Sequence, residues 1–104
     1  MIQISNPNGA EFRLEHNATR LVFQCSAHIG TGSDPATNRY SPWQEVGEGD
    51  WEAQHQPSGV RQRVTIRRDD RRAFAVISHA LVNPGPAEVM VQTLRSVTGR
   101  VELA

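Results

Sequence analysis

Four histidines and one cysteine are the side chains of this sequence that most readily bind metals or act as nucleophiles. They are His16, His28, His55, His79 and Cys25. No two of the histidines are spaced for joint metal binding on one element, and there is no second cysteine to act as a ligand. A metal site would need distant histidines to converge with a carboxylate. We therefore predict ordinary surface or hydrogen-bonded histidines, no metal and no cofactor.

Cys25 is a possible nucleophile, with His28 or another histidine as its base. It lies in phase with Leu21, Phe23 and Ala27, which form one face of an alternating apolar segment. A free cysteine on a core face behaves as a small hydrophobic residue. We therefore predict that Cys25 is buried and structural, and that the chain contains no catalytic residue.

Three aromatic residues, Tyr40, Trp43 and Trp51, lie close together in a loop-rich stretch and form a first candidate binding site. Exposed aromatic rings beside polar groups hold sugar rings by stacking, and they also anchor protein interfaces. The alternative is that the tryptophans fill the core, since the chain has only three phenylalanines. An acidic cluster around the tryptophans is interpreted as a solvated turn, and its members are Glu45, Glu48, Asp50 and Glu52.

Six arginines along one predicted hairpin form a second candidate binding site. They are Arg61, Arg63, Arg67, Arg68, Arg71 and Arg72. Arginine makes bidentate pairs with carboxylates and phosphates, so the set is suited to an interface. Asp69 and Asp70 neutralise part of the charge, and the alternative is that the arginines only keep an exposed strand from pairing. We do not expect nucleic acid as a partner, because no aromatic side chain is interleaved among the arginines.

Charge and composition exclude several classes of function. Eleven acidic residues balance eleven basic ones, which removes the general electrostatic argument for nucleic acid or an anionic membrane. No apolar run approaches the roughly 18 residues that span a bilayer, and no basic and apolar leader opens the sequence. We therefore expect no membrane contact and a location in the cytoplasm or within a particle.

Short alternating apolar segments broken by turn residues predict strands along the whole chain. The clearest pair is a hairpin, and three matches fix its register: Phe12 with Phe23, Leu14 with Leu21, and Glu15 with Arg20. Residues 30–42 are predicted to form a long loop. Two short strands are expected at residues 43–46 and 51–55, and a last one at residues 101–103 after a turn at 98–99.

A second hairpin is predicted around Asp69 and Asp70. We prefer a loop with an odd number of residues, because it groups the apolar side chains: Ile66 opposite Phe74 and Val64 opposite Val76. The return strand has apolar residues on both faces. That pattern predicts a central position in its sheet.

The predicted fold class is all-β, a small antiparallel β-sandwich or barrel of about seven to nine short strands. Residues 1–104 form a single domain. Residues 86–98 leave an alternative open, since Met90, Val91 and Leu94 also fit a helical stripe. That alternative is an α+β fold with one helix near 86–98, but alternating β-branched residues favour a strand.

No spacing in the sequence favours catalysis, so the leading hypothesis is a non-catalytic binding module. We expect a structural subunit of a larger protein assembly, virion-like or another multi-subunit particle, as a homo- or hetero-oligomer. The arginine hairpin and residues 30–51 are its expected contact surfaces. The second hypothesis is a small carbohydrate-binding module. The third is a small metal- or Cys/His-dependent enzyme, which needs three of His28, His55, His79 and Cys25, or two with a carboxylate, in one pocket.

Overall fold

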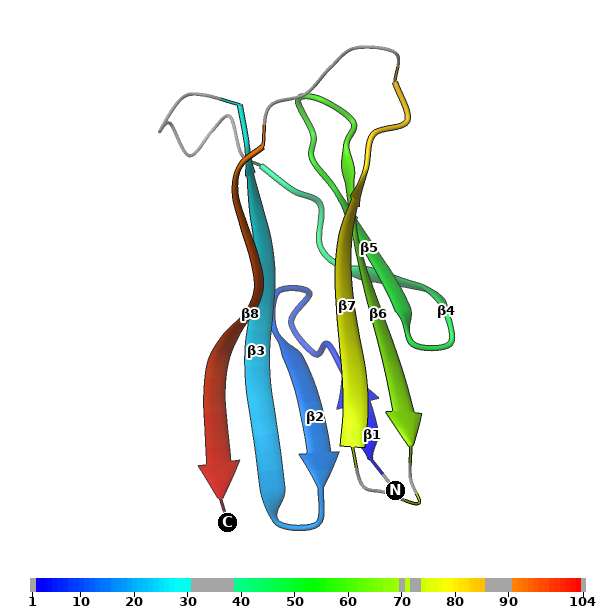
Figure 1. The fold of residues 1–104 in the computed structure, drawn as a ribbon, viewed down its shortest axis with the longest axis vertical. Helices are drawn as coiled ribbons and strands as arrows, with labels where there is room; N and C mark the ends of the chain where they lie inside the picture. Colours follow the sequence, from blue (N-terminus) through cyan, green and yellow to red (C-terminus); the bar gives the residue numbers. More distant parts are fainter. Residues whose placement is uncertain (1, 31–38, 70, 72–73, 86–90, 104) are drawn as a thin grey trace.

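The computed structural model describes residues 2–30, 39–69, 71, 74–85 and 91–103. In these residues eight antiparallel strands form two four-stranded sheets (Figure 1). The strands are β1 (Gln3–Ser5), β2 (Phe12–His16), β3 (Thr19–Ile29), β4 (Gln44–Gly47), β5 (Asp50–Gln54), β6 (Arg61–Asp69), β7 (Phe74–Val82) and β8 (Val91–Leu103). The predicted all-β antiparallel class is confirmed. Within those residues there is no helix long and apolar enough to cross a membrane.

The two sheets pack face to face as a sandwich. Their strand orders are β1-β2-β3-β8 and β4-β5-β6-β7. Figure 1 looks between the sheets, with β8, β3 and β2 on one side and β7, β6 and β5 on the other. β3 and β6 approach each other across the interior. Among the described strands, β7 and β8 are each the last strand of a sheet. The interior lies between β3 and β6, their neighbours within the two sheets.

The first hairpin has the predicted register. β2 pairs with β3, and its matches are Phe12 with Phe23, Leu14 with Leu21, and Glu15 with Arg20. The turn between the strands contains Asn17 with a φ of 54°, a left-handed conformation that asparagine adopts more readily than most residues. Complementary pairs on both faces of this hairpin explain why its register could be predicted.

The core lies between β2 and β3 on one side and β5 and β6 on the other. Its buried members are Phe12, Phe23, Cys25, Val64 and Ile66. The Phe12 ring stacks on Phe23 with centroids 5.3 Å apart. It also meets Trp43 and Trp51 edge-on, with centroids 5.1 Å and 5.6 Å away. Both tryptophans are thus partly buried against the core, as the core-filling alternative predicted.

The register of the second hairpin differs from the prediction. The loop between β6 and β7 has four residues, 70–73, because Asp69 pairs with Phe74. Ile66 consequently lies opposite Ile77, so the predicted odd-numbered loop and its pairings are wrong. β7 is apolar on both faces, so its hydrophobic pattern does not select which face turns inward. The observed register turns Ala75 inward and Phe74 outward.

The position of β7 also differs from the prediction. β7 is the last strand of its sheet in the part of the chain that the structure describes, so the predicted central position is wrong. Ala75 and Ile77 face the core and are half-buried. Phe74 and Val76 point outward and are 44% and 52% exposed.

Residues 91–103 form one strand, β8, which pairs with β3. The helix alternative near 86–98 is therefore wrong for residues 91–98, and residues 86–90 lie outside the described part. β8 contains two register shifts, opposite Gln24/Ser26 and His28/Ile29. The predicted turn at 98–99 is also wrong, because Gly99 pairs with Phe23 inside the strand. A side chain at Gly99 would collide with the Val22 carbonyl oxygen, so glycine allows this close approach.

The strands predicted at 43–46 and 51–55 are observed as β4 and β5 within one residue of their expected ends. Residues 31–38 of the predicted long loop lie outside the described part.

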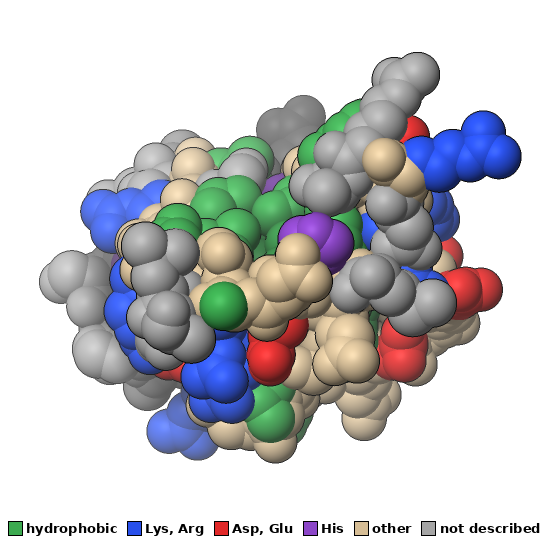
Figure 2. Space-filling model, turned by 90° about the horizontal axis from the view of Figure 1, so that it is seen from below, with side chains coloured by type: hydrophobic (Ala, Val, Ile, Leu, Met, Phe, Trp, Pro, Cys, Tyr) green, Lys and Arg blue, Asp and Glu red, His purple; other side chains and the backbone are tan. Residues whose placement is uncertain are grey.

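The exposed large apolar side chains of the described residues are Val46, Phe74, Val76, Val91, Leu94, Val97 and Val101. All except Val46 belong to β7 or β8. Figure 2, which views the molecule from the end carrying both termini, shows apolar side chains reaching the surface.

Gly49 and Gly59 offer a matched test of the β4–β5 turn, because both are left-handed, with φ of 74° and 77°. A Cβ on Gly49 would collide with the Ile66 carbonyl oxygen, whereas a Cβ on Gly59 has Gln54 Nε2 as its nearest neighbour, at 3.8 Å. We expect Gly59→Ala to lower the free energy of unfolding by about 1 kcal/mol, the cost of the backbone conformation alone.

Gly49→Ala should lower the free energy of unfolding by at least about twice as much as Gly59→Ala, because the collision with the Ile66 carbonyl oxygen adds to the backbone cost. Urea unfolding of the two variants and the wild type measures both losses. Equal losses would contradict the close packing of the turn against β6.

Candidate functional site

Arg61, Arg63 and Arg67 of β6 lie on the outer face of the sheet, where carboxylates of β5 neutralise two of them. Arg63 Nη2 lies 2.6 Å from Glu52 Oε2, and Arg67 Nη2 lies 2.9 Å from Asp50 Oδ1. The structure thus joins two features that are separate in the sequence, the acids around the tryptophans and the arginine hairpin. Exposed ion pairs stabilise a fold only slightly. Their main effect here is to engage two guanidinium groups within the chain itself.

The other arginines of the set differ in their surroundings. Arg68 Nη1 donates a hydrogen bond to the Ile2 carbonyl oxygen at 2.8 Å, which ties the start of the chain to β6. Arg61 and Arg71 are exposed, and Arg72 lies outside the described residues. The set is therefore spread along one hairpin and is not gathered around one point.

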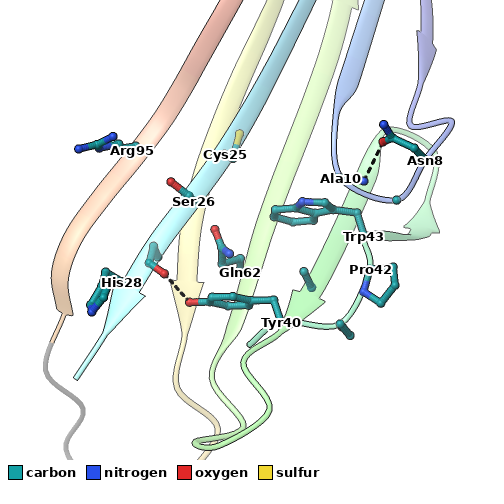
Figure 3. Close-up of a pocket in the computed structure, with 14 residues that line it drawn as sticks. Asn8, Ala10, Cys25, Ser26, His28, Tyr40, Pro42, Trp43, Gln62 and Arg95 are labelled. Carbon is teal, nitrogen blue, oxygen red and sulfur yellow. Dashed lines mark hydrogen bonds between the residues drawn. The ribbon is translucent and has the colours of Figure 1, made fainter. Parts of the chain in front are cut away.

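The three candidate aromatic rings are divided between two places. Tyr40 and Trp43 line a pocket between the sheets (Figure 3). Trp51 instead packs on Phe12 in the core, with its Nε1 buried and without a hydrogen-bond partner. Tyr40 and Trp43 are half-buried. The structure brings two of the three rings to one site, and that site is a recess and not a flat surface.

The pocket has a volume of about 650 Å³ and combines aromatic with polar side chains. Its lining includes Asn8, Ser26, Tyr40, Trp43, Gln62 and Arg95. The Tyr40 hydroxyl donates to the Ala27 carbonyl oxygen at 2.9 Å, and burial raises the pKa of Tyr40 to about 12. Tyr40 is therefore fixed in position as a neutral phenol. The recess could take a polar ligand with one apolar face.

Cys25 lies on the core face of β3 and also lines the pocket. It is 6% exposed, and burial raises the pKa of its thiol to about 12. A buried thiol stays protonated at neutral pH, which makes it a poor nucleophile. The predicted burial of Cys25 is confirmed.

The histidines lie in different surroundings. His28 follows Cys25 on β3 and lines the same pocket, whose described lining contains no carboxylate. His55 is buried, with its Nδ1 2.6 Å from Ser58 Oγ. In the described ranges no group of three or more His, Cys, Asp or Glu side chains could hold a metal ion. Of the four groups predicted for an enzyme site, the pocket lining contains Cys25 and His28, and it contains neither His55 nor His79.

His79 lies on the core-facing side of β7, paired with a buried glutamine. Its Nε2 lies 2.7 Å from Gln62 Oε1, an arrangement in which the imidazole N–H donates to the amide oxygen. Its Nδ1 is buried and has no hydrogen-bond partner. Burial lowers the pKa of His79 below the ordinary value of 6.5. The neutral imidazole is the form that this position favours.

Sequence reasoning missed the most distinctive surface, the side of the sandwich where β7 and β8 run. Figure 3 shows both strands along the same margin of the sandwich, with the colours of Figure 1. We call this side the open side; it presents Phe74, Val76, Val91, Leu94, Val97 and Val101. The signal was present, since the nine residues of β7 include no charged residue. It was interpreted as a mark of a central strand.

Comparisons with known proteins add no relative. A scan against protein-family models, a search of curated proteins and a search of solved structures each find no match for this chain. The function must therefore be argued from the geometry of the open side and of the pocket.

The burial of His79 predicts a pH dependence of stability. The pKa of His79 is lower in the folded chain than the value of 6.5 for the unfolded chain. Between these two values the unfolded chain binds more protons, so the free energy of unfolding should fall as the pH falls below about 6.5. Above that pH His79 is neutral in both states, and its contribution is fully present.

Urea unfolding at several pH values between about 5 and 8, the range in which histidine titrates, measures how the free energy of unfolding changes with pH. His79→Gln should flatten the slope, whereas His28→Gln, on the neighbouring sheet, should leave the contribution of His79 in place. An unchanged slope in His79→Gln would show that other groups cause the pH dependence.

Proposed function

We propose that this chain is a non-catalytic β-sandwich subunit that works by binding other protein subunits in a larger assembly. The observation that supports this is β7, which is the last strand of its sheet in the described part of the chain and has nine residues with neither charge nor proline. The free backbone groups of a terminal strand pair with other chains unless short length, charge, proline or a bulge prevents it. β7 lacks all four protections, since its pairing with β6 is also free of register shifts.

The side chains of the open side support the same proposal. Val91, Leu94 and Val101 of β8 lie opposite Ile29, Ala27 and Leu21, so they belong to the row that faces the opposite sheet. They nevertheless remain 45%, 48% and 63% exposed. Exposed apolar side chains that gather in a patch usually mark a contact with another protein, and this row gathers along β8. A partner on the open side would cover this row.

Four members of the arginine set, Arg61, Arg63, Arg67 and Arg68, adjoin the proposed interface, because they lie on β6 beside β7. Arg67 lies opposite Val76 and Arg61 opposite Val82. A contact made through apolar side chains and backbone hydrogen bonds persists in high salt, whereas a contact made through arginines weakens. We propose that the apolar edge provides the contact and that the arginines border it.

The proposal is tested with a charge placed on the open side. In a native extract of cells that naturally express the chain, we expect wild type to elute well above the 11.5 kDa of one chain. Val76→Lys should shift the chain to the monomer mass, because a charged side chain opposes strand pairing. Size exclusion with detection by an antibody or a tag measures both.

Val46→Lys is the matched control, since Val46 is a 58% exposed valine on β4, at the other end of the same sheet. It should leave the complex intact. A wild-type chain at the monomer mass would overturn the proposal, and so would equal effects of the two lysines.

A second candidate function is the binding of a small carbohydrate in the pocket. It is favoured by the two rings, Tyr40 and Trp43, which share the recess with amide and guanidinium groups. We expect glucose, galactose or N-acetylglucosamine to shift the NMR signal of the Trp43 indole N–H. Trp51 serves as the internal control, because it lies outside the pocket lining. No shift at Trp43, or equal shifts at both tryptophans, would exclude this candidate.

A further inference from the structure

We infer that the partner of β7 is a second copy of this chain, with the two β7 strands antiparallel about a two-fold axis at Ser78. This inference rests on the proposed function and specifies its partner. The pairing would join the β4-β5-β6-β7 sheets of two copies into one continuous sheet.

The four sheet edges of the described chain are not equally protected. β1 has three residues, and β4 has four residues and a register shift between Glu45 and Gly47. β8 carries the exposed charges of Arg95 and Arg100 and two register shifts. Short length, irregularity and charge each hinder pairing with another chain. β7 is the edge that remains, because its nine residues pair with β6 in an unbroken register.

The sequence of β7 is compatible with itself across a two-fold axis. With the axis at Ser78 all nine residues overlap, and each side chain meets one from the same face of the sheet. The outward pairs are Phe74 with Val82, Val76 with Ala80, and Ser78 with Ser78 of the second copy. The core-facing pairs are Ala75 with Leu81 and Ile77 with His79. An axis between two residues would set outward side chains against core-facing ones, which strand pairing does not permit.

Electrostatics also allow a second copy. A two-fold pair brings like residues together, and β7 contributes no charge that could repel its counterpart. The described cations opposite β7 are Arg61, Arg63, Arg67 and Arg68 of β6. Arg63 and Arg67 pair with Glu52 and Asp50 of their own chain, and Arg68 donates to the Ile2 carbonyl oxygen. The whole chain has a net charge of zero, so two copies do not repel each other over long distances.

Symmetry also favours pairing β7 with β7, because a two-fold contact closes on itself. Pairing β7 with β8 of another copy is heterologous, and it leads to rings or filaments unless a second such contact closes the dimer.

The experiment places single cysteines on β7 of the full chain and oxidises the purified protein. Ser78→Cys puts the two new thiols directly opposite each other, within the Cα separation of roughly 4.4–6.8 Å that a disulfide spans. Val76→Cys is the matched control. It faces residue 80 of the second copy, so the two thiols at position 76 lie about 13 Å apart along the strands.

We expect Ser78→Cys to form at least about ten times more disulfide dimer than Val76→Cys on a non-reducing gel, since the disulfide geometry is met only at the axis. Wild type should form none, because its one thiol, Cys25, is buried. Light scattering should give a dimer mass for wild type that persists in high salt, and a monomer mass for Val76→Lys. Circular dichroism verifies that each variant is folded.

Other results overturn the inference in distinguishable ways. A wild-type dimer with no disulfide at position 78 would place the contact elsewhere, for example between β7 and β8. A purified chain that is monomeric and uncrosslinked, but large in the native extract, would mean that a different protein occupies β7. The inference then fails while the proposed function stands. A monomer in both settings overturns both.

Discussion

The packing of the Phe12 ring against Trp43 and Trp51 is the contact on which the two sheets depend. Phe12 is fully buried and stacks on Phe23 within its own sheet, so this one ring contacts three other aromatic side chains in the interior. Aromatic rings bury more area than any other side chains. In a chain with 38% apolar residues, this cluster fixes where a well-packed core can form.

This concentration leaves the other side of the sandwich poorly covered. Of the five phenylalanines and tryptophans, only Phe74 lies outside the cluster, and it is exposed on β7. Near β8 a second buried cluster consists of Ala27, Ile29 and Val60, with Tyr40 and Leu81 packed against it. Its buried members are aliphatic and fill less of the roughly 10 Å between packed sheets than aromatic rings do. The exposure of the β8 valines follows from how the aromatic residues are distributed along the sequence.

The accuracy of sequence reasoning differed between elements for physical reasons. The first hairpin was predictable in register, because apolar and charged pairs agree on one alignment. The ion pair between Arg63 and Glu52 was not predictable, because it requires β5 and β6 to be neighbours in the sheet, which no local pattern specifies. The pocket was missed for the same reason, since Tyr40 and Gln62 meet only after the sheets pack. The choice of strand over helix at residues 91–98 depended on β3 offering an edge.

The wrong prediction for β7 has a different origin and carries more information. Its pattern, apolar on both faces, is typical of a strand with neighbours on both sides, yet among the described strands it has one neighbour, β6. Local sequence and global structure usually agree, and places where they disagree tend to be functional. Pairing with another strand removes the disagreement, because β7 then becomes internal to its sheet. The proposed pairing would therefore explain why β7 has the sequence of an internal strand although it is the last described strand of its sheet.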